Sequence, residues 1–475
     1  MNKNIIQKAI LDLQYNGTVD GIALQRSIGD WANEELLSIL DTQLQKADKN
    51  DRLIKIDRLD IDIDLSGKEG MTEQLSKKLN EQLIYALNKV IEGKALSEPV
   101  EAMSLSGSFA EEVLFFIEHG DLPWWSRVNK QQDFFKELQI FTETKPGSKF
   151  LNSLISLIAN ENVQRRLAWQ MHDIIFYRII YWLAPSLRSS LPALIKEMDQ
   201  VKTFVAQQEM RSIETIFKNS LLSNISSNAE DITVGSILRS FIEGLENAGF
   251  GSVIKVGIDK AVTPLLKKYT TKAKPGPPTK GSLKKKQMPG TSDPSKQTEG
   301  GKGEIIPVAA SGGIYINNAG LVIIAGFLPH FFKRLGIMSD NVITDKNKAA
   351  FLVQFLASGN EAIAEFELGL SKILCDIGME EAVDTSIVLS GKEKNEANDL
   401  LLSAIEYWNI LRDTSVEGLR GSFLMRSGKI WFENEEWHLL VEQKPYDMLL
   451  QHLPWSINII RLPWMRYPLR TEWAY

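Results

Sequence analysis

The sequence has few of the residues from which disulfide frameworks and metal sites are built. Its 475 residues include one cysteine, Cys375, and five histidines. A single cysteine excludes an internal disulfide and any multi-cysteine site, and we expect Cys375 to be a small buried hydrophobic residue rather than a nucleophile. No two histidines have the three- or four-residue spacing that places both on one helix face, so we predict no metal site.

Long uncharged apolar runs are also absent from the sequence. The longest apolar stretches, such as residues 174–181, are interrupted by a charge, here Arg178. A membrane-spanning helix needs about 20 consecutive apolar residues, and the N-terminus lacks the basic and apolar regions of a secretory signal. We predict no membrane span and a cytosolic location, unless the chain is exported as part of a particle.

Motifs of several catalytic classes are missing. The sequence contains no Gly-x-x-x-x-Gly-Lys-Ser/Thr phosphate loop and no Gly-x-Ser-x-Gly elbow. Residues 62–73 place oxygen ligands at positions 1, 3, 5 and 12 of an EF-hand loop, but the residues before it alternate as a strand and position 8 is Glu69. We interpret this segment as an acidic strand face and a turn. No acid–base pair stands out among the carboxylates, so we predict no catalytic residue, no metal, no cofactor and no enzyme.

The charge of the chain is distributed unevenly. Ten lysines and three acidic residues lie between residues 267 and 304, which gives this segment +7 and, from a total of −6, leaves −13 for the rest. With its many Pro, Gly, Ser and Thr residues, the segment cannot bury enough apolar area to offset its ordering entropy. We predict a disordered basic linker at residues 269–304, which reads no nucleic-acid sequence because it lacks interleaved aromatic residues.

Apolar spacing predicts an α+β protein with three folded parts around this linker. Residues 1–100 form an N-terminal α/β anchor domain, a β-α-β-α unit with strands at 5–14 and 59–65 and helices at 22–44 and 71–92. The second strand has the clearest alternation, because Asp60, Asp62 and Asp64 separate apolar residues.

Residues 101–268 are predicted to form a helical middle region, and residues 305–475 a C-terminal α+β domain. The expected middle helices are 109–118, 131–141, 151–159, 162–183, 191–206 and 234–247. In the C-terminal domain we expect helices at 319–335, 346–357 and 395–411 and β-like runs at 421–426, 430–432, 438–443 and 457–461.

Aromatic residues gather near the C-terminus. Six of the eleven tryptophans lie between residues 408 and 473, and Leu-Pro-Trp occurs at both 453–455 and 462–464. Tryptophan combines a large apolar area with one N–H donor, so this end is interpreted as a rigid packing or docking surface. The candidate partner-binding residues are Trp124, Trp125, Arg420, Tyr446, Trp455 and Trp464. For Trp124 and Trp125, a turn that buries both indoles is the alternative.

Several segments resemble one known family. They are residues 5–11, 21–26, 56–62, 116–125, 314–322, 327–332, 414–423 and 454–465. In this order they are similar to the contractile injection system tape measure family, whose members occur in extracellular, phage-tail-like contractile particles. The resemblance implies a structural protein that acts inside the growing tube and sets how many tube and sheath rings are added. It carries over no catalytic residue.

The resemblance also implies partners and leaves alternatives open. The expected partners are tube, baseplate or tail-cap proteins, with several copies in each particle. The chain is expected to lie inside the tube after assembly. The middle is short for a ruler and is broken by prolines, so one straight helix is not expected. A baseplate assembly chaperone or cargo-loading adaptor of the same particle is the alternative function. A carried effector enzyme is a third hypothesis, which requires a catalytic constellation.

Overall fold

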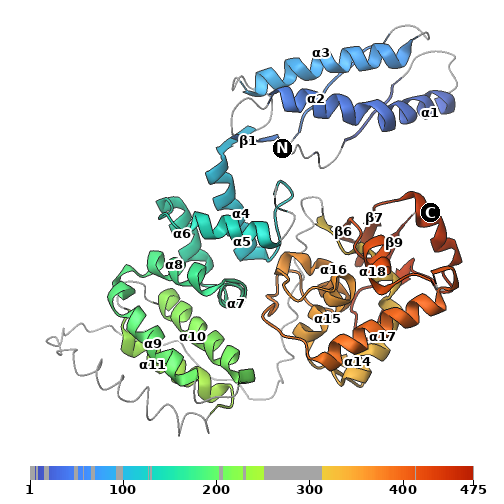
Figure 1. Cartoon of the computed structure of the whole chain (residues 1–475). Helices are drawn as coiled ribbons and strands as arrows, with labels where there is room; N and C mark the ends of the chain where they lie inside the picture. Colours follow the sequence, from blue (N-terminus) through green and yellow to red (C-terminus); the bar gives the residue numbers. More distant parts are fainter. Residues whose placement is uncertain are drawn as a thin grey trace, which may run out of the picture. The chain divides into compact units, whose positions relative to one another are not determined.

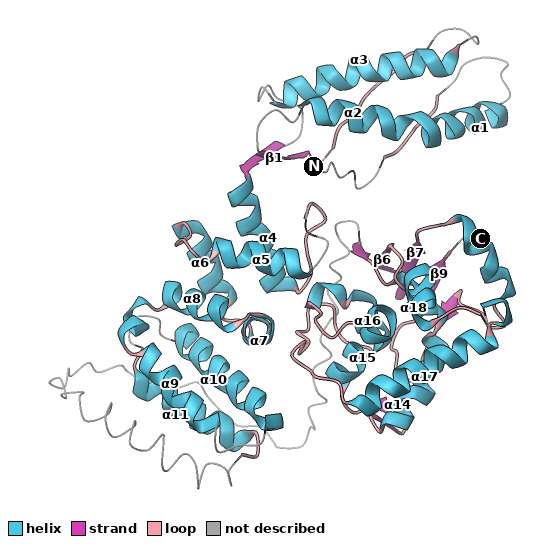
Figure 2. Cartoon of the chain, in the orientation of Figure 1, coloured by secondary structure: helices cyan, strands magenta, loops and turns pink. Residues whose placement is uncertain are grey.

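The computed structural model has two compact units (Figures 1 and 2). The first unit takes Met1–Val113 and Pro123–Asn129, and the second takes Leu114–Leu122 and Lys130–Tyr475. The structure describes residues 6, 9–14, 21–47, 52–56, 58–65, 70–91, 100–126, 128, 131–202, 207–227, 232–250, 313–411 and 413–473. The predicted basic linker at 269–304 lies outside the described residues.

The first unit is built on two helical segments that pack side by side (Figure 1). The first consists of α1 (Gly21–Trp31), the π-helix η1 (Ala32–Leu36) and α2 (Leu37–Ala47), which follow one another without a break, and the second is α3 (Met71–Ile91), which lies along them. Their apolar faces bury Ile28, Trp31 and Leu79 in one cluster. The Trp31 indole N–H donates to Ser76 Oγ at 2.7 Å, so the polar edge of this cluster is also satisfied.

The strands of the first unit differ from those predicted. β1 (Arg52–Ile56) pairs antiparallel with β2 (Val100–Ser104), whereas the described residues of the predicted strands 5–14 and 59–65 belong to no strand. The described residues of the unit therefore form two strands, but in the order helix, strand, helix, strand.

The two faces of segment 59–65 were nevertheless predicted correctly. Ile61 and Ile63 pack against the helix cluster, and Asp60, Asp62 and Asp64 are exposed. Alternation indicates one packed face and one solvated face, and an extended segment that lies on helices has both without a strand ladder. The pattern therefore could not establish strand pairing.

The helical middle, here residues 114–122 and 130–250 of the second unit, is built of helices, as predicted. They are the end of α4 (Leu105–His119), α5 (Gln131–Phe141), α6 (Ser148–Leu157), α7 (Glu161–Gln170), α8 (Asp173–Leu183), η2 (Pro185–Ser189), α9 (Leu191–Lys202), α10 (Gln207–Ser227) and α11 (Val234–Asn247). The predicted helix 162–183 is two helices, because Met171 and His172 adopt extended backbone conformations between α7 and α8. No glycine or proline marks this break, and α10 was not predicted.

Side-chain caps begin two of these helices. Asn160 accepts a hydrogen bond from the Asn162 N–H at the start of α7, and Thr233 and Ser236 form a reciprocal capping box at the start of α11. Each cap satisfies backbone N–H groups that have no partner inside the helix.

The C-terminal region, residues 313–473 of the second unit, is α+β, as predicted. Its five-stranded mixed sheet has the order β3-β6-β7-β9-β8, with β7 and β9 parallel. The strands are β3 (Ile314–Ile316), β6 (Gly428–Glu433), β7 (Glu436–Val441), β8 (Ile459–Ile460) and β9 (Leu469–Glu472), and a separate hairpin pairs β4 (Met338–Ser339) with β5 (Val342–Ile343).

Helices and 3-10 turns pack with this sheet around one apolar core. They are η5 (Ala319–Ile323), η6 (Ala325–Phe327), α14 (Leu328–Leu335), α15 (Lys346–Ser358), η7 (Glu365–Glu367), α16 (Gly369–Leu374), α17 (Gly391–Tyr407), η8 (Asn409–Leu411), α18 (Val416–Leu419), η9 (Arg420–Leu424) and η10 (Pro445–His452). The predicted helix 319–335 is three shorter elements. The predicted β-like run 421–426 is wrong, because residues up to Leu424 form the π-helix η9. Among the described residues, we find no helix long and apolar enough to cross a membrane.

Candidate functional site

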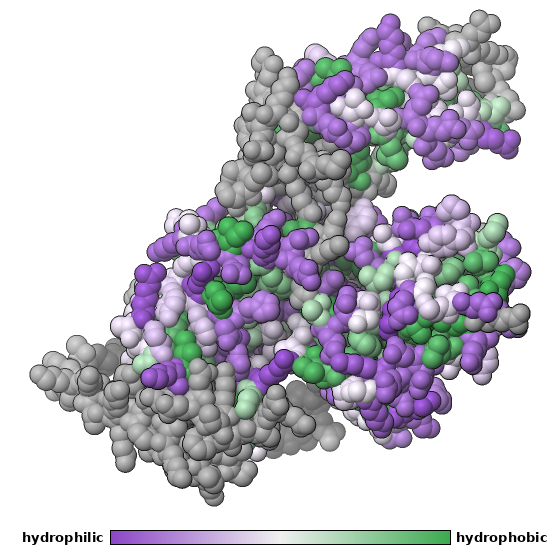
Figure 3. Space-filling model, viewed as in Figure 1, coloured by the Kyte–Doolittle hydropathy of each residue, from purple (hydrophilic) through white to green (hydrophobic). Residues whose placement is uncertain are grey.

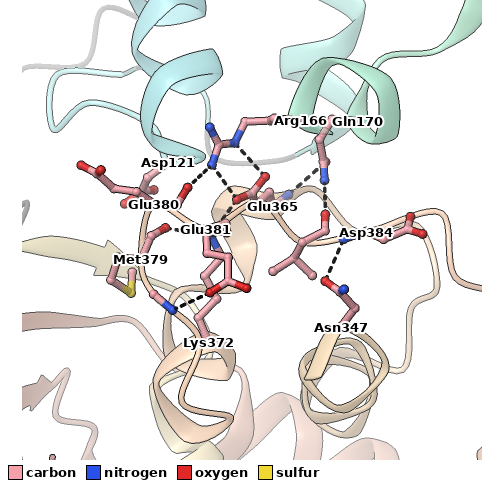
Figure 4. A network of polar contacts seen from close by, with 12 residues as sticks. Asp121, Arg166, Gln170, Asn347, Glu365, Lys372, Met379, Glu380, Glu381 and Asp384 are labelled. Carbon is pink, nitrogen blue, oxygen red and sulfur yellow. Dashed lines mark hydrogen bonds and ion pairs between the residues drawn. The ribbon is translucent and has the colours of Figure 1, made fainter. Parts of the chain in front are cut away.

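A buried cluster of charged side chains joins the helical middle to the C-terminal region inside the second unit (Figure 4). Arg166 comes from α7, Glu365 from η7 and Lys372 from α16. The side chains of all three are at most 2% exposed. We call Arg166, Glu365 and Lys372 the ionic seam.

Arg166 uses all of its donors in the seam. Its Nε and Nη2 donate to the two oxygens of Glu365 at 2.9 and 3.1 Å. Nη1 donates to the carbonyls of Ile117 and Glu118 at 2.6 and 2.9 Å, and Nη2 also donates to the Glu380 carbonyl at 2.8 Å. A guanidinium has five N–H groups, so this charge is buried with every donor satisfied.

Lys372 is satisfied in the same way. Its Nζ donates to Glu365 Oε1 at 2.6 Å and to the carbonyls of Met379 and Glu381, both at 2.8 Å. Burial lowers the pKa of Lys372, and the nearby Glu365 carboxylate opposes that shift. Because its three donors are already bonded, Lys372 has none left for a substrate.

Amide and imidazole contacts extend the seam along the same two parts. Gln170 Nε2 donates to the Val383 carbonyl at 2.9 Å, and Gln170 Oε1 accepts from the Glu365 N–H at 3.3 Å. At the solvent edge, His119 Nδ1 lies 3.2 Å from Glu380 Oε1. The helical middle thus contacts the C-terminal region through backbone groups as well as through charges.

Gly120 allows the end of α4 to approach the seam closely. Its φ is +76°, and a Cβ at this position would lie 2.3 Å from Glu365 Oε1 and 2.8 Å from Arg166 Nη2. Since Arg166 also binds the last carbonyls of α4, the guanidinium acts as the C-terminal cap of that helix. Only glycine meets both requirements, the positive φ and the lack of a side chain.

Asp121 follows this glycine and lies close to the charged groups. Burial raises the pKa of its carboxyl from 3.8 to about 7, and the hydrogen bond from the Leu122 N–H and the charge of Lys372 oppose the shift. This carboxyl therefore changes its protonation near neutral pH.

One aromatic ring adds an apolar contact between the same two parts. Phe366, the residue after Glu365, lies 5.9 Å from the ring of Phe116 and 5.8 Å from that of Phe134, with both pairs edge to face. Such pairs contribute about 1 kcal/mol each beyond area burial.

A second buried ion pair stabilises the C-terminal region itself. Arg426 Nη1 lies 3.0 Å from both oxygens of Asp447, and Arg426 Nη2 donates to the Ser422 carbonyl at 2.5 Å. Asp447 also accepts from the Trp473 indole N–H at 2.9 Å and from the Lys444 N–H at 2.8 Å. This cluster connects η9, η10 and the residues after β9.

Two predicted docking residues, Trp455 and Trp464, are half-buried in this region. The Trp455 indole N–H donates to the Ile323 carbonyl, and that of Trp464 to the Leu374 carbonyl, both at 2.8 Å. Both side chains pack against the apolar core. Each Leu-Pro-Trp triplet is therefore fixed to an element about a hundred residues away in sequence.

Tyr446 and Arg420 take different positions. Tyr446 is 37% exposed, and its hydroxyl donates to the Ser422 carbonyl at 3.2 Å. Arg420 lies against the C-terminal end of α15: its Nε donates to the Leu356 carbonyl at 3.1 Å, and a Cβ on Gly359 would lie 3.1 Å from its Nη1. Arg420 therefore caps a helix, and Tyr446 keeps part of its ring available.

Trp124 and Trp125 lie in the first unit. Their rings are 5.9 Å apart and perpendicular. Lys55 Nζ lies 3.6 Å from the centroid of the Trp125 ring and 3.0 Å from Glu111 Oε2. This cation–π contact ties the turn to β1, and both indoles are half-buried.

The remaining predicted sites are placed as follows. Cys375 is fully buried, as predicted, and burial raises the pKa of its thiol. The EF-hand-like loop is only partly described, since residues 66–69 lie outside the described residues. The described parts of the chain contain no group of three or more His, Cys, Asp or Glu arranged to hold a metal ion.

The ionic seam was not among the predicted sites. Arg166 lies on the buried face of α7 with Val163, Leu167 and Gln170, so a charge within an apolar helix face was the available signal. Its partner Glu365 lies 199 residues away. Such a pair is not visible in one sequence.

The comparisons with curated proteins and with solved structures gave no match. The comparison with protein families matched residues 3–473 to the model of the contractile injection system tape measure protein. This match covers nearly the whole chain, including both terminal segments that carried the resemblance. The chain therefore belongs to the contractile injection system tape measure protein family.

Proposed function

We propose that this protein is a structural assembly component of a contractile injection particle, in which it sets the length of the tube and sheath. Its terminal parts act as anchors, and the residues between them act as the spacer. Tube, baseplate or tail-cap proteins are its partners, and several copies act in each particle. It assembles in the cytoplasm and then lies inside the tube, without catalysing a reaction.

The single observation that supports an anchor is the way the C-terminal end is fixed. Trp455, Trp464 and Trp473 each donate an indole hydrogen bond to a distant part of the C-terminal region. A rigid chain end loses less conformational entropy on binding a partner than a mobile chain end does. This end is therefore suited to hold one terminus of a spacer against a partner surface.

Partner contacts are proposed on the exposed parts of the predicted residues. The candidates remain Trp124, Trp125, Arg420, Tyr446, Trp455 and Trp464, of which Tyr446 is 37% exposed. Other large apolar side chains of the C-terminal region, such as Tyr407 and Met448, are 68% and 63% exposed. Apolar surface is visible on this region among polar residues (Figure 3), which is suited to a protein partner.

In this function the chain is divided as its sequence predicts. An N-terminal anchor domain at 1–100 and a C-terminal domain at 305–475 enclose a helical middle at 101–268 and a linker at 269–304. In this division the spacer is the middle together with the linker.

The test is to lengthen the spacer. Helix-forming blocks of 28 and 56 residues, inserted separately between Asn247 and residue 269, should lengthen the particle by about 42 and 84 Å, because a helix rises about 1.5 Å per residue. Particle lengths are measured by electron microscopy. A control block placed before residue 6, outside the spacer, should leave the length unchanged.

An unchanged length in otherwise normal particles would contradict the ruler and favour a baseplate assembly chaperone or cargo-loading adaptor. One observation favours this alternative: the helical middle is folded into short helices and packs on the C-terminal region. In that form it is much shorter than a straight helix of the same residues.

A further inference from the structure

Polar groups make several of the contacts between the helical middle and the C-terminal region. Arg166 and Gln170 bind Glu365 and Val383, His119 lies beside Glu380, and Arg211 contacts the Ser386 carbonyl. Phe366 adds aromatic contacts with Phe116 and Phe134. An interface of this composition resembles the separable interfaces between domains more than it resembles a core.

Charge burial makes the docking specific without making it strongly stable. Removing two opposite charges from water costs about as much as their attraction returns, so a fully satisfied buried pair contributes little net free energy. A misplaced or half-open seam, in contrast, leaves charges buried without partners. The seam therefore favours two states, docked and fully separated, over intermediate ones.

The connectivity of the chain permits separation. The helical middle takes residues 114–122 and 130–250, and the C-terminal region takes residues 313–473, so the two parts follow one another along the chain. The last middle helix and the first C-terminal strand are joined by enough chain to span about 200 Å when extended.

We propose that the ionic seam is a releasable latch. It holds the helical middle against the C-terminal region in the free protein and opens when the chain is built into a particle. This inference rests on the proposed function, because a spacer needs its helices free of the end domain. Arranged end to end as helix, residues 114–247 would reach about 200 Å.

The latch can be tested by locking it reversibly. We would substitute His119→Cys and Glu380→Cys, whose native side chains meet at the solvent edge of the seam, and join them with a bismaleimide that has a disulfide in its spacer. Cys375 is fully buried and does not compete. The locked protein is added to a lysate that makes all other particle components but lacks this chain, and assembled particles are counted by electron microscopy.

The expected result is loss of particle assembly with the locked protein and recovery after the spacer is cleaved by reductant. The matched control is Arg334→Cys with Glu396→Cys, an ion pair at 2.8 Å within the C-terminal region. Its lock does not cross the seam, so assembly should continue. Normal assembly of the seam-locked protein would overturn the latch, and so would equal loss in both locked proteins.

The insertion series separates this inference from the proposed function. A length shift with inserts, together with normal assembly of the locked protein, would reject the latch and keep the ruler. Unchanged length, together with reversible loss of assembly on locking, would reject the ruler and keep a latch that serves an adaptor.

Discussion

Arg166 alone binds the Glu365 carboxylate and three backbone carbonyls, so one substitution removes several buried hydrogen bonds. Arg166→Met would leave Glu365 with Lys372 as its remaining charged partner and would leave the carbonyls at the end of α4 without their cap. Removing one member of a buried ion pair costs about 3 to 5 kcal/mol. We expect the free energy of unfolding to fall by that amount in urea titrations followed by circular dichroism.

The neighbouring arginine supplies the control for this change. Arg165 is 42% exposed and pairs with Glu161 one turn away. Exposed pairs of this kind contribute about 0.5 kcal/mol, so Arg165→Met should change stability little. Equal losses of stability in the two variants would show that the buried Arg166 contributes no more to the free energy of unfolding than an exposed arginine does.

Asp121 predicts a pH dependence at the residue scale. Its pKa is about 7 in the folded protein against 3.8 ordinarily, so the folded state binds more protons between these values. The stability from this group is complete below about pH 4 and is lost as the pH rises through about 7. The loss should be on the order of 4 kcal/mol, because a difference of one pKa unit corresponds to about 1.4 kcal/mol.

Asp121→Asn removes this titration and keeps an oxygen that can accept from the Leu122 N–H. The difference in stability between variant and wild type should therefore grow in favour of the variant from pH 4 to pH 8, measured by urea unfolding at each pH. Asp133→Asn, at an exposed position on α5, serves as the control. A flat difference for Asp121→Asn would reject the raised pKa.

At the scale of elements, the C-terminal end depends on indoles that bind distant backbone. Trp464→Ala would remove the hydrogen bond to Leu374 at the end of α16 and the contact with the Phe332 ring, 5.5 Å away. Truncating a large, half-buried side chain here should cost about 2 kcal/mol. Thermal unfolding monitored by circular dichroism measures the loss.

Tyr407→Ala tests whether any aromatic truncation has this effect. Tyr407 is 68% exposed, so its loss should stay within about 0.5 kcal/mol. If Trp464→Ala were as mild as Tyr407→Ala, the tryptophan would be a docking residue and not a structural one.

Element type could be predicted from sequence better than element pairing. The helices of the middle follow from apolar residues at three- and four-residue spacing, yet the break at Met171 has no local signal. Segment 59–65 alternates as a strand does, although the ladder forms between β1 and β2. Spacing reports which faces are buried, and pairing depends on chain far away in sequence.

At the scale of the whole molecule, the α+β class and the family could be predicted because several ordered motifs carry them. The seam could not, since Arg166 and Glu365 come together only when the helical middle docks on the C-terminal region. Control of particle length is also a property of the whole molecule. The insertion series tests it directly, because the length of the assembled particle is measured and not a property of the free chain.

The first unit is not a continuous stretch of chain, because Pro123–Asn129 returns to it after an excursion into the second unit. During synthesis, Lys55 leaves the ribosome about seventy residues before Trp125, its cation–π partner. Folding of this unit can therefore be completed only after residues 123–129 have emerged. Exchange of anchors between related chains would need to carry residues 123–129 along with the N-terminal part, so a simple crossover ahead of α4 would produce a mismatched hybrid.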